Sequence, residues 1–501
     1  MTDRDPQQEI VDFLSKTLGA PRRIVTHISI VLLGADRVYK LKRAVRLPYL
    51  DFSTRALRLE MCAREVAFNQ RFSAGLYLGV RRVTREPDGA LALDGAGEFI
   101  DAVVEMRRFA DDALFEDMAR TGRLTGEMIE TLARRVAGSH DEAAPDTVHG
   151  GADAMRRIVD SMAESLGRAP AADTAETDAH LAALRDALAA QAGRIDARRA
   201  QGRVRPCHGD LNLRNICLFE NEPTPFDCIE FSDEISTIDV LYDIAFLLMD
   251  LWRVGLPALA NVAFNRYLDA RRESEADGLP LLPFFMALRA TIRAHVEASQ
   301  GHAETARAFF HLSRAVLRRS EGAIVAIGGF SGSGKSSIAA ALAPRLAPAP
   351  AARILNSDRI RKRLFNAAPA DRLPPQAYTS EVSKRVYEEM FAAAARVARA
   401  GWPVIVEAVF DRPQDRAAIE TAAATAGVPF FGFWLDVDLA QRRARVERRV
   451  DDVSDATAEV LAAQMKKETG AIAWETIDAA RELSAIVGQL RDVLPAWRGE
   501  R

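Results

Sequence analysis

The chain has 501 residues, of which 48% are hydrophobic and 27% are charged, and its formal net charge is -3. A chain of this length exceeds what one hydrophobic core usually organises, so the sequence predicts two domains. The composition excludes disordered and fibrous proteins. The small net charge gives no general attraction to nucleic acid or to an anionic membrane, so we expect neither as a partner.

The cysteines and the N-terminus bear on the cellular compartment. Cys62, Cys207, Cys217 and Cys228 form no C-x-x-C pair of the kind that zinc and redox sites use. Three of them flank the first active site predicted below, so a redox switch is the alternative to simple packing in the core. The N-terminus lacks an export signal, and no stretch approaches the ~18 apolar residues that cross a bilayer. The sequence thus predicts a soluble, cytoplasmic protein.

The first hundred residues have the pattern of a small α+β lobe. Apolar residues alternate over residues 24–42 around turn residues at 34–36, which predicts a β-hairpin. Apolar residues at roughly helical spacing over residues 53–72 predict a helix, and a strand-rich stretch follows through residues 103–106. Helical patterns then extend over residues 111–201 and resume after residue 250. We therefore expect a helical lobe after the sheet lobe.

A new pattern begins after Ser320, and we expect a domain boundary there. Strand-like apolar runs alternate with helical segments, which predicts a parallel sheet covered by helices, the layout of α/β nucleotide kinases. The sequence thus predicts one domain over residues 1–320 and an α/β domain over residues 321–501. The apolar runs lie at residues 323–328, 353–355, 403–406 and 429–435.

A polar loop at residues 207–216 carries the first chemical signal. It reads CHGDLNLRNI, so Asp210 lies five positions before Asn215. Phosphoryl transfer needs a carboxylate that accepts the proton of the substrate hydroxyl and a neutral oxygen ligand for Mg²⁺. We assign Asp210 as the catalytic base and Asn215 as a metal ligand. The alternative is a polar turn whose aspartate is satisfied by hydrogen bonds.

Three other stretches support the catalytic reading. Residues 226–231, FDCIEF, form a strand that ends in carboxylates, where kinases place an acidic Mg²⁺ ligand. Upstream, the strand VYKLK bears a lysine, and the helix after it carries Glu65, which is a candidate partner for that lysine. Downstream, residues 239–245, DVLYDIA, supply a second aspartate placed to brace the loop by hydrogen bonds.

With these residues in view, residues 1–320 resemble the aminoglycoside phosphotransferase-like (kinase-like) family, whose HGDxxxxN loop is matched in full. The resemblance implies a bilobal, protein-kinase-like α+β fold with ATP between the lobes. It implies Asp210 as base, Asn215 on Mg²⁺, and Lys40 with Glu65 over the phosphates. Lys42 is the alternative to Lys40, because both lysines point to the same face of the strand.

The chain departs from this family at two places. The second metal ligand of the family is usually aspartate, whereas the matching position here is Glu230, with Asp227 three residues earlier as the alternative. No G-x-G-x-x-G stretch lies over the phosphates. We expect residues 26–29 to supply hydroxyl and backbone donors in its place.

Residues 329–336, GFSGSGKS, fit the phosphate-binding pattern G-x-x-x-x-G-K-[ST] in full, after a predicted strand and before a predicted helix. Glycines let backbone N–H groups close around phosphates, and the helix N-terminus favours the anion. The lysine reaches the β- and γ-phosphate oxygens and the last serine binds Mg²⁺. The nucleotide-binding residues predicted here are Gly329, Ser331, Gly332, Ser333, Gly334, Lys335 and Ser336.

Three further positions complete a kinase in this half. Asp358 follows the second strand of the α/β sheet, at the edge where such sheets place ligands, and is the predicted base or substrate contact. Glu407 ends an apolar strand as a metal-binding carboxylate does, with glutamate where aspartate is common. Arg445 and Arg449 lie four apart in the most basic stretch, and we assign them to a lid over the transferring phosphate. The alternative for these arginines is a solvated helix face.

Residues 321–501 resemble P-loop small-molecule kinases, and the order of the halves resembles bacterial fusions of an aminoglycoside phosphotransferase-like kinase with an AAA-type ATP-binding protein. The resemblance implies a bifunctional enzyme that uses ATP and Mg²⁺ to phosphorylate a hydroxyl of a small-molecule acceptor. One alternative is a regulatory protein in which one nucleotide site is not catalytic. Another is a 5′-end nucleic-acid kinase in the second half, with the arginines as a phosphate-binding patch.

Overall fold

The computed structural model describes residues 7–47, 50–346, 348–368, 370–447, 461, 464 and 467–494. The chain forms two compact units and passes between them more than once. The boundary expected near Ser320 falls in the connection between a helix that ends at Val316 and a strand that begins at Ala323. The first unit comprises Met1–Ile158, Ile195–Val254 and Ala270–Arg272, and the second comprises Val159–Arg194, Gly255–Asp269 and Glu273–Arg501.

A six-stranded antiparallel sheet in the order β1-β2-β3-β8-β6-β7 opens the first unit. The predicted hairpin is present, with its turn closed by a hydrogen bond from the Gly34 N–H to the Arg37 carbonyl. The strands are β1 (Arg22–Val25), β2 (Ser29–Leu33), β3 (Arg37–Lys42), β6 (Tyr77–Arg85), β7 (Leu91–Leu93) and β8 (Glu98–Arg107), with a small separate pair β4 (Arg46–Leu47) and β5 (Leu50–Asp51).

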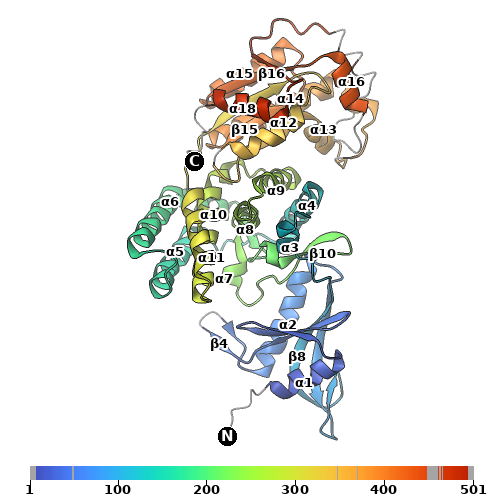
Figure 1. The fold of residues 1–501 in the computed structure, drawn as a ribbon, viewed down its shortest axis with the longest axis vertical. Helices are drawn as coiled ribbons and strands as arrows, with labels where there is room; N and C mark the ends of the chain where they lie inside the picture. The colour runs from blue at the N-terminus through green and yellow to red at the C-terminus, as the bar shows by residue number, and fades with distance from the viewer. Residues whose placement is uncertain are drawn as a thin grey trace. The chain divides into compact units, whose positions relative to one another are not determined.

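Two helices, α1 (Gln8–Thr17) and α2 (Arg55–Gln70), cover this sheet, and Figure 1 shows α2 alongside β8. Tyr39 and Leu41 of β3 belong to the buried cluster that contains apolar residues of α1, whereas Val38 packs in the cluster that contains apolar residues of α2. Side chains alternate along a strand, so Lys40 and Lys42 share the face of Val38. Both lysines therefore point towards α2.

The remainder of the first unit is mainly helical, and its most buried helix is α8 (Val240–Arg253). The side chain of Asp239 caps α8 by accepting a hydrogen bond of 2.8 Å from the Leu241 N–H. Helices α5 and α6 contribute residues to both units. The other elements are α3 (Phe115–Arg120), α4 (Gly126–Glu142), α5 (Gly151–Arg168), α6 (Thr174–Ala200), β9 (Val204–Pro206), η1 (Leu213–Asn215), β10 (Ile216–Phe219), β11 (Glu222–Pro225), α7 (Asp233–Ser236) and β12 (Thr237–Asp239).

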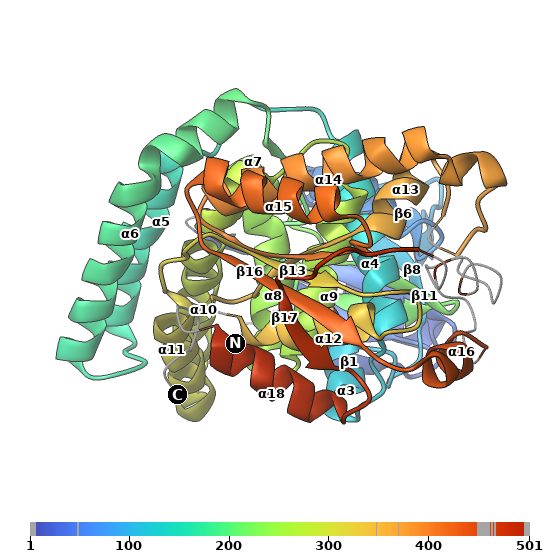
Figure 2. The ribbon, with the colours of Figure 1, turned by 90° about the horizontal axis from the view of Figure 1, so that it is seen from above.

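The second unit contains the predicted parallel sheet, in the order β14-β15-β13-β16-β17. Four strands coincide with the predicted apolar runs, and the fifth, β17, was not expected because its sequence, ETID, is polar and largely exposed. Figure 2 shows α14 and α15 along one face of this sheet and α12 and α18 along the other. The strands are β13 (Ala323–Gly328), β14 (Arg353–Asn356), β15 (Pro403–Glu407), β16 (Phe430–Asp436) and β17 (Glu475–Asp478).

The helices of the second unit come from both sides of Ser320. Those before it are α9 (Pro257–Ala270), η2 (Ala276–Leu281), α10 (Leu282–Ser299) and α11 (Ala303–Val316). Those after it are α12 (Lys335–Leu342), η3 (Ala343–Arg345), α13 (Ser357–Leu364), η4 (Pro375–Tyr378), α14 (Ser380–Arg399), α15 (Pro413–Ala426), α16 (Leu439–Glu447) and α18 (Leu483–Val493). Among the described helices, none has the length and apolar character that crossing a bilayer requires.

A buried polar network joins α9 to β14, the edge strand of the parallel sheet. The Asn265 side chain accepts hydrogen bonds from the Ile354 N–H at 2.7 Å and from the Arg353 guanidinium at 3.0 Å, and it donates to the Ala352 carbonyl at 3.2 Å. Asn261 donates to the Ala352 carbonyl at 3.0 Å. The α9 helix thus satisfies backbone groups of the edge strand.

Replacing Asn265 with alanine should destabilise the second unit by roughly 2–4 kcal/mol. The change leaves the buried Ile354 N–H without its acceptor, and unsatisfied buried groups cost more than an average hydrogen bond contributes. Chemical denaturation followed by tryptophan fluorescence measures this, since Trp402 donates to the neighbouring Ala351 carbonyl. Thr421→Ala, which removes one exposed hydrogen bond from α15, is the control and should shift stability by at most about 0.5 kcal/mol. Equal effects of the two substitutions would contradict the bracing role of Asn265.

Candidate active sites

The loop that carries Asp210 is braced by an aspartate of the stretch 239–245, as predicted, and the structure shows that this aspartate is Asp243 of α8. The Gly209 N–H donates to Asp243 Oδ1 at 2.8 Å, and the His208 N–H donates to Oδ2 at 3.3 Å. His140 Nε2 also lies 3.1 Å from Oδ2. All these groups are buried, so the aspartate is a fixed support for the loop.

His208 fixes the backbone of Asp210. Its Nε2 donates to the Phe226 carbonyl at 2.9 Å, and its Nδ1 accepts a hydrogen bond from the Asp210 N–H at 3.3 Å. This arrangement needs a neutral ring, and burial lowers the pKa of His208, which favours that form. Gly209 has φ +83, and a Cβ there would lie 3.2 Å from Ile229. The turn between His208 and Asp210 therefore requires glycine.

The structure brings Asp210 and Asn215 together. The Asn215 amide nitrogen donates to the Asp210 carbonyl at 3.0 Å and to Asp210 Oδ2 at 2.7 Å. Because the nitrogen is committed to Asp210, the amide oxygen is the atom left for a cation. The same segment is anchored by Asp250, which accepts a hydrogen bond of 3.0 Å from the Leu213 N–H.

Five charged side chains form one continuous chain beside this loop. Glu65 accepts from Lys40 Nζ at 2.7 Å through one oxygen and from Lys42 Nζ at 2.8 Å through the other. Lys40 also pairs with Asp227, and Lys42 also pairs with Glu230. The two lysines that the sequence offered as alternatives therefore both bind Glu65.

The two ends of this chain differ in exposure. Lys42 and Glu65 are fully buried and Glu230 is 3% exposed, whereas the Asp227 side chain is 45% exposed. Burial raises the pKa of Glu230. Burial also acts to raise the pKa of Glu65, but the two ammonium groups hold it at about 2. Lys42 and Glu230 thus form the interior end, and Lys40 and Asp227 form the end near solvent.

Two other expectations concern the same unit. In the turn before β2, the Thr26 hydroxyl accepts from the Ser29 N–H at 2.9 Å, so this hydroxyl serves the turn itself. The four cysteines are free and buried, and burial raises the pKa of Cys62 and of Cys217 to about 12. Thiols held in this protonated form are poor nucleophiles, which favours packing over a redox switch.

In the second unit, the P-loop connects β13 to α12 as predicted. Gly329 has φ +144 and a Cβ there would lie 2.7 Å from Ser333 Oγ, while Gly334, at φ +93, caps α12. Lys335 Nζ donates to the Gly329 carbonyl at 2.7 Å. The Ser331 N–H donates to Gln464 Oε1 at 3.0 Å. The Lys335 ammonium group therefore lies beside the P-loop backbone at the N-terminus of α12.

Glu407 is placed beside this loop by strand register. Asn356 ends β14 directly opposite Glu407 at the end of β15, and its amide nitrogen donates to Glu407 Oε1 at 2.9 Å. Burial raises the pKa of Glu407, and hydrogen bonds from Asn356 and Ser336 oppose that rise. Ser336 and Glu407, the predicted metal-binding pair, both line the pocket described next.

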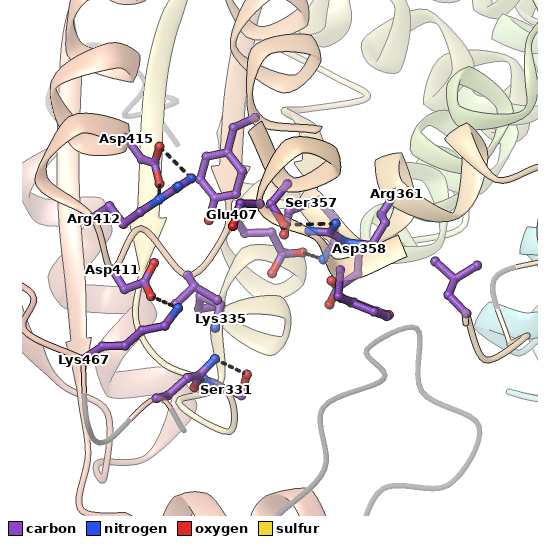
Figure 3. A pocket seen from close by; sticks show the side chains of 18 of the residues that line it. Ser331, Lys335, Ser357, Asp358, Arg361, Glu407, Asp411, Arg412, Asp415 and Lys467 are labelled. Atoms are coloured by element: carbon purple, nitrogen blue, oxygen red, sulfur yellow. Dashed lines mark hydrogen bonds and ion pairs between the residues drawn. The ribbon is translucent and has the colours of Figure 1, made fainter. Parts of the chain in front are cut away.

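A pocket of about 630 Å³ extends from the P-loop to α13, and Figure 3 shows Lys335, Glu407, Asp358 and Arg361 around it. Sequence reasoning assigned no role to Arg361, although its position three residues after Asp358 puts both on one helix face. The residues lining the pocket are Ser331, Lys335, Ser336, Asn356, Ser357, Asp358, Arg361, Arg372, Leu373, Pro375, Tyr378, Ser380, Ser383, Tyr387, Glu407, Val409, Asp411, Arg412, Asp415, Gln464 and Lys467.

Of the two predicted lid arginines, Arg445 is not among the residues that line this pocket. Arg445 donates to the Ser333 carbonyl at 3.3 Å and to the Ala479 carbonyl at 2.8 Å, so it contacts the P-loop backbone. Arg449 lies outside the described residues. Arg442 is placed over the Phe330 ring at 5.1 Å.

Comparisons with known proteins match two stretches of the chain to protein families. Residues 64–278 match the phosphotransferase enzyme family, and residues 324–469 match an AAA domain. The chain joins a phosphotransferase domain to a P-loop kinase domain. It is an ATP-dependent kinase. Uncharacterized proteins of Mycobacterium bovis and Mycobacterium tuberculosis are 29% identical to it over 500 residues, which covers 94% of this chain and 94% of theirs.

Solved structures resemble separate parts of the kinase. A choline/ethanolamine kinase family protein from Mesorhizobium loti is 14% identical and covers 61% of this chain and 94% of its own, with a TM-score of 0.38. The APS kinase of Mycobacterium tuberculosis, in complex with AMPPNP and APS, is 22% identical and covers 35% of this chain and 98% of its own, with a TM-score of 0.27.

Replacing Lys42 with methionine should destabilise the first unit by about 3–5 kcal/mol, because Glu230 is left as a buried, unpaired charge. The double substitution Lys42→Met, Glu230→Gln removes that charge and should recover roughly half of the loss. Chemical denaturation followed by circular dichroism measures both variants. Arg22→Met, which breaks an exposed pair with Asp111, should cost less than about 1 kcal/mol. A double variant no more stable than Lys42→Met alone would mean that Lys42 and Glu230 are not coupled.

Proposed function

We propose that this kinase transfers the γ-phosphoryl group of ATP at two sites, each to a hydroxyl of a small-molecule acceptor. The observation that supports the proposal is that each unit holds several of the residues assigned from the sequence to catalysis and phosphate binding. In the first unit, Asn215 donates to Asp210, and Lys40 pairs with Glu65 and Asp227. Lys335, Ser336 and Glu407 line the pocket of the second.

In the first unit, Asp210 is the base that accepts the proton of the acceptor hydroxyl. Its carboxylate is oriented by Asn215, and its backbone is held by His208 and, through Gly209, by Asp243. Lys40 binds phosphate oxygens, because it is the lysine at the solvent end of the charge chain. Lys42 holds Glu65 in place from inside and stays away from the nucleotide.

The donor set of the first unit fits Mg²⁺, which prefers oxygen ligands. The residues that would hold it are Asn215, through its amide oxygen, and Asp227, through its half-exposed carboxylate. Glu230, which the sequence favoured, is occupied by Lys42 in the interior, so we assign the metal to Asp227 instead. When bound, Mg²⁺ neutralises the charge on the phosphate oxygens.

In the second unit, the backbone N–H groups of the P-loop and Lys335 bind the phosphates. Ser336 and Glu407 supply the oxygens for Mg²⁺, and their place in the lining of one pocket supports a shared ligand. Asp358 is the base, because it lines the same pocket at the carboxyl end of β14. Arg445 positions the P-loop through the Ser333 carbonyl. We propose no role for Arg449 beyond the predicted lid.

The two sites should bind nucleotide independently. Calorimetric titration with Mg²⁺ and a non-hydrolysable ATP analogue should give two sites per chain in the wild type. Lys335→Ala removes a charge-assisted contact of roughly 1.5–3 kcal/mol, so the second site should weaken by about one to two orders of magnitude while the first is unchanged. Asp210→Asn should leave both affinities within a small factor. A wild-type stoichiometry of one would favour the regulatory alternative, in which one site has no catalytic role.

Exchanging the two candidate carboxylates should separate metal binding from stability. In a Lys335→Ala background, Asp227→Asn should weaken Mn²⁺ binding with the ATP analogue by about tenfold or more, as electron paramagnetic resonance measures. Glu230→Gln should leave Mn²⁺ affinity within a small factor and lower the unfolding midpoint, because Lys42 loses its buried partner. The reverse pattern would return the metal to Glu230.

A further inference from the structure

Arg361 is a buried cation that lines the pocket of the second unit. It is 6% exposed, and its guanidinium carbon lies 4.9 Å from the centre of the Tyr378 ring. One terminal nitrogen donates to the Ala377 carbonyl at 2.7 Å, and Ser383 Oγ lies 3.4 Å from the same nitrogen. Its Nε is buried and has no hydrogen-bond partner. Among the residues that the structure describes, no carboxylate pairs with this guanidinium.

Two other cations of the pocket, Arg412 and Lys467, are paired with carboxylates of the protein. Arg412 makes two hydrogen bonds to Asp415, at 2.8 and 3.2 Å, and Lys467 pairs with Asp411 at 2.6 Å. Against these, Arg361 keeps an uncompensated charge in a largely buried position. Burying a guanidinium without a counter-ion is costly, and in a binding pocket that cost is offset when the ligand brings the missing negative charge.

Asp358 and Arg361 are one turn apart on α13. Side chains three residues apart on a helix lie on the same face, with Cβ atoms about 5–6 Å from each other. Both line the pocket, and Figure 3 shows them on the same side of it. A ligand that presents a hydroxyl to Asp358 therefore extends past Arg361 within a few bond lengths.

We propose that the acceptor of the second unit is a small hydroxy acid, a molecule with one hydroxyl for Asp358 and one carboxylate, phosphate or sulfate group for Arg361. This proposal rests on the kinase function assigned to the P-loop site. In the reaction, the acceptor oxygen bonds to the γ-phosphorus of ATP, the bond from that phosphorus to the β–γ bridging oxygen breaks, and ADP leaves. The hydroxyl proton passes to Asp358. The product is the phosphate ester of the hydroxy acid.

Sulfate is a direct probe of the anion site. The full chain is first saturated with Mg²⁺ and the non-hydrolysable ATP analogue, which occupies the P-loop, and sulfate is then titrated by calorimetry. Arg361→Gln should weaken sulfate binding by at least about tenfold, and Arg361→Lys should restore part of it. Arg363→Gln, on the same helix but exposed and outside the pocket, is the matched control and should bind sulfate as the wild type does.

Turnover identifies the anion and tests the alternatives. With the first site silenced by Asp210→Asn, ADP release is measured with hydroxy carboxylates, hydroxyalkyl phosphates, hydroxyalkyl sulfates, neutral polyols of similar size and a 5′-hydroxyl oligonucleotide. At least one anionic acceptor should give faster ADP release than every neutral acceptor. For that acceptor, Arg361→Gln should raise KM more than it lowers kcat. Turnover of polyols alone, or of the oligonucleotide alone, would overturn the hydroxy-acid proposal.

If no acceptor in the panel turns over, the sulfate titration alone tests the hydroxy-acid proposal. Sulfate affinity that is equal in the wild type and in Arg361→Gln would overturn the proposal on its own. Failure of the ATP analogue to bind in a Lys335-dependent way would instead overturn the P-loop kinase function beneath it. The two failures are therefore distinguishable in one set of titrations.

Discussion

The first unit depends on a single buried carboxylate, Glu65, that is shared by two lysines. Each oxygen of Glu65 takes one ammonium group, so the spacing between α2 and β3 is set by charge as well as by apolar packing. A buried carboxylate is tolerated only when it is paired, and here the pairing runs on to Asp227 and Glu230. The two ends of this chain of charges therefore differ. The interior pair, Lys42 and Glu230, is buried, and the outer pair, Lys40 and Asp227, lies nearer to solvent, where we propose that it meets a nucleotide and its metal.

In the second unit, backbone geometry positions the site residues, whereas the first unit uses a chain of charged side chains. Parallel strands β14 and β15 end at the same level, which puts Asn356 against Glu407 without any long side chain. Glycines allow the P-loop to turn closely, and the first turn of α12 presents its N–H groups to the same space. In our proposal, one chain therefore binds phosphate groups in two ways, by Lys40 on a sheet and by the amide groups of a helix N-terminus.

Residue type and spacing were sufficient for the loops and the sheet. The HGDxxxxN stretch, the P-loop and the four apolar strands of the parallel sheet are local patterns, and local patterns are what a sequence displays directly. Partner choice was not predictable. Whether Lys40 or Lys42 meets Glu65 depends on how deeply α2 packs, and the answer is that both do. Asp227 and Glu230 are three residues apart, yet only the fold decides which one faces solvent. Arg361 became a candidate ligand contact only from the structure, in which no described carboxylate pairs with its guanidinium.

The asparagines of α9 have a consequence for aggregation. An edge strand offers unpaired backbone groups to any extended chain that meets it, and natural proteins protect such edges. On β14 this protection comes from α9, whose Asn265 takes the Ile354 N–H and whose Asn261 donates to the Ala352 carbonyl. This helix lies within the stretch that matches the phosphotransferase family, so that stretch supplies the cover for an edge of the sheet in the stretch that matches the AAA domain. A P-loop domain separated from that helix would present the backbone of Ile354 and Leu355 on an uncovered edge strand as a template for cross-chain pairing.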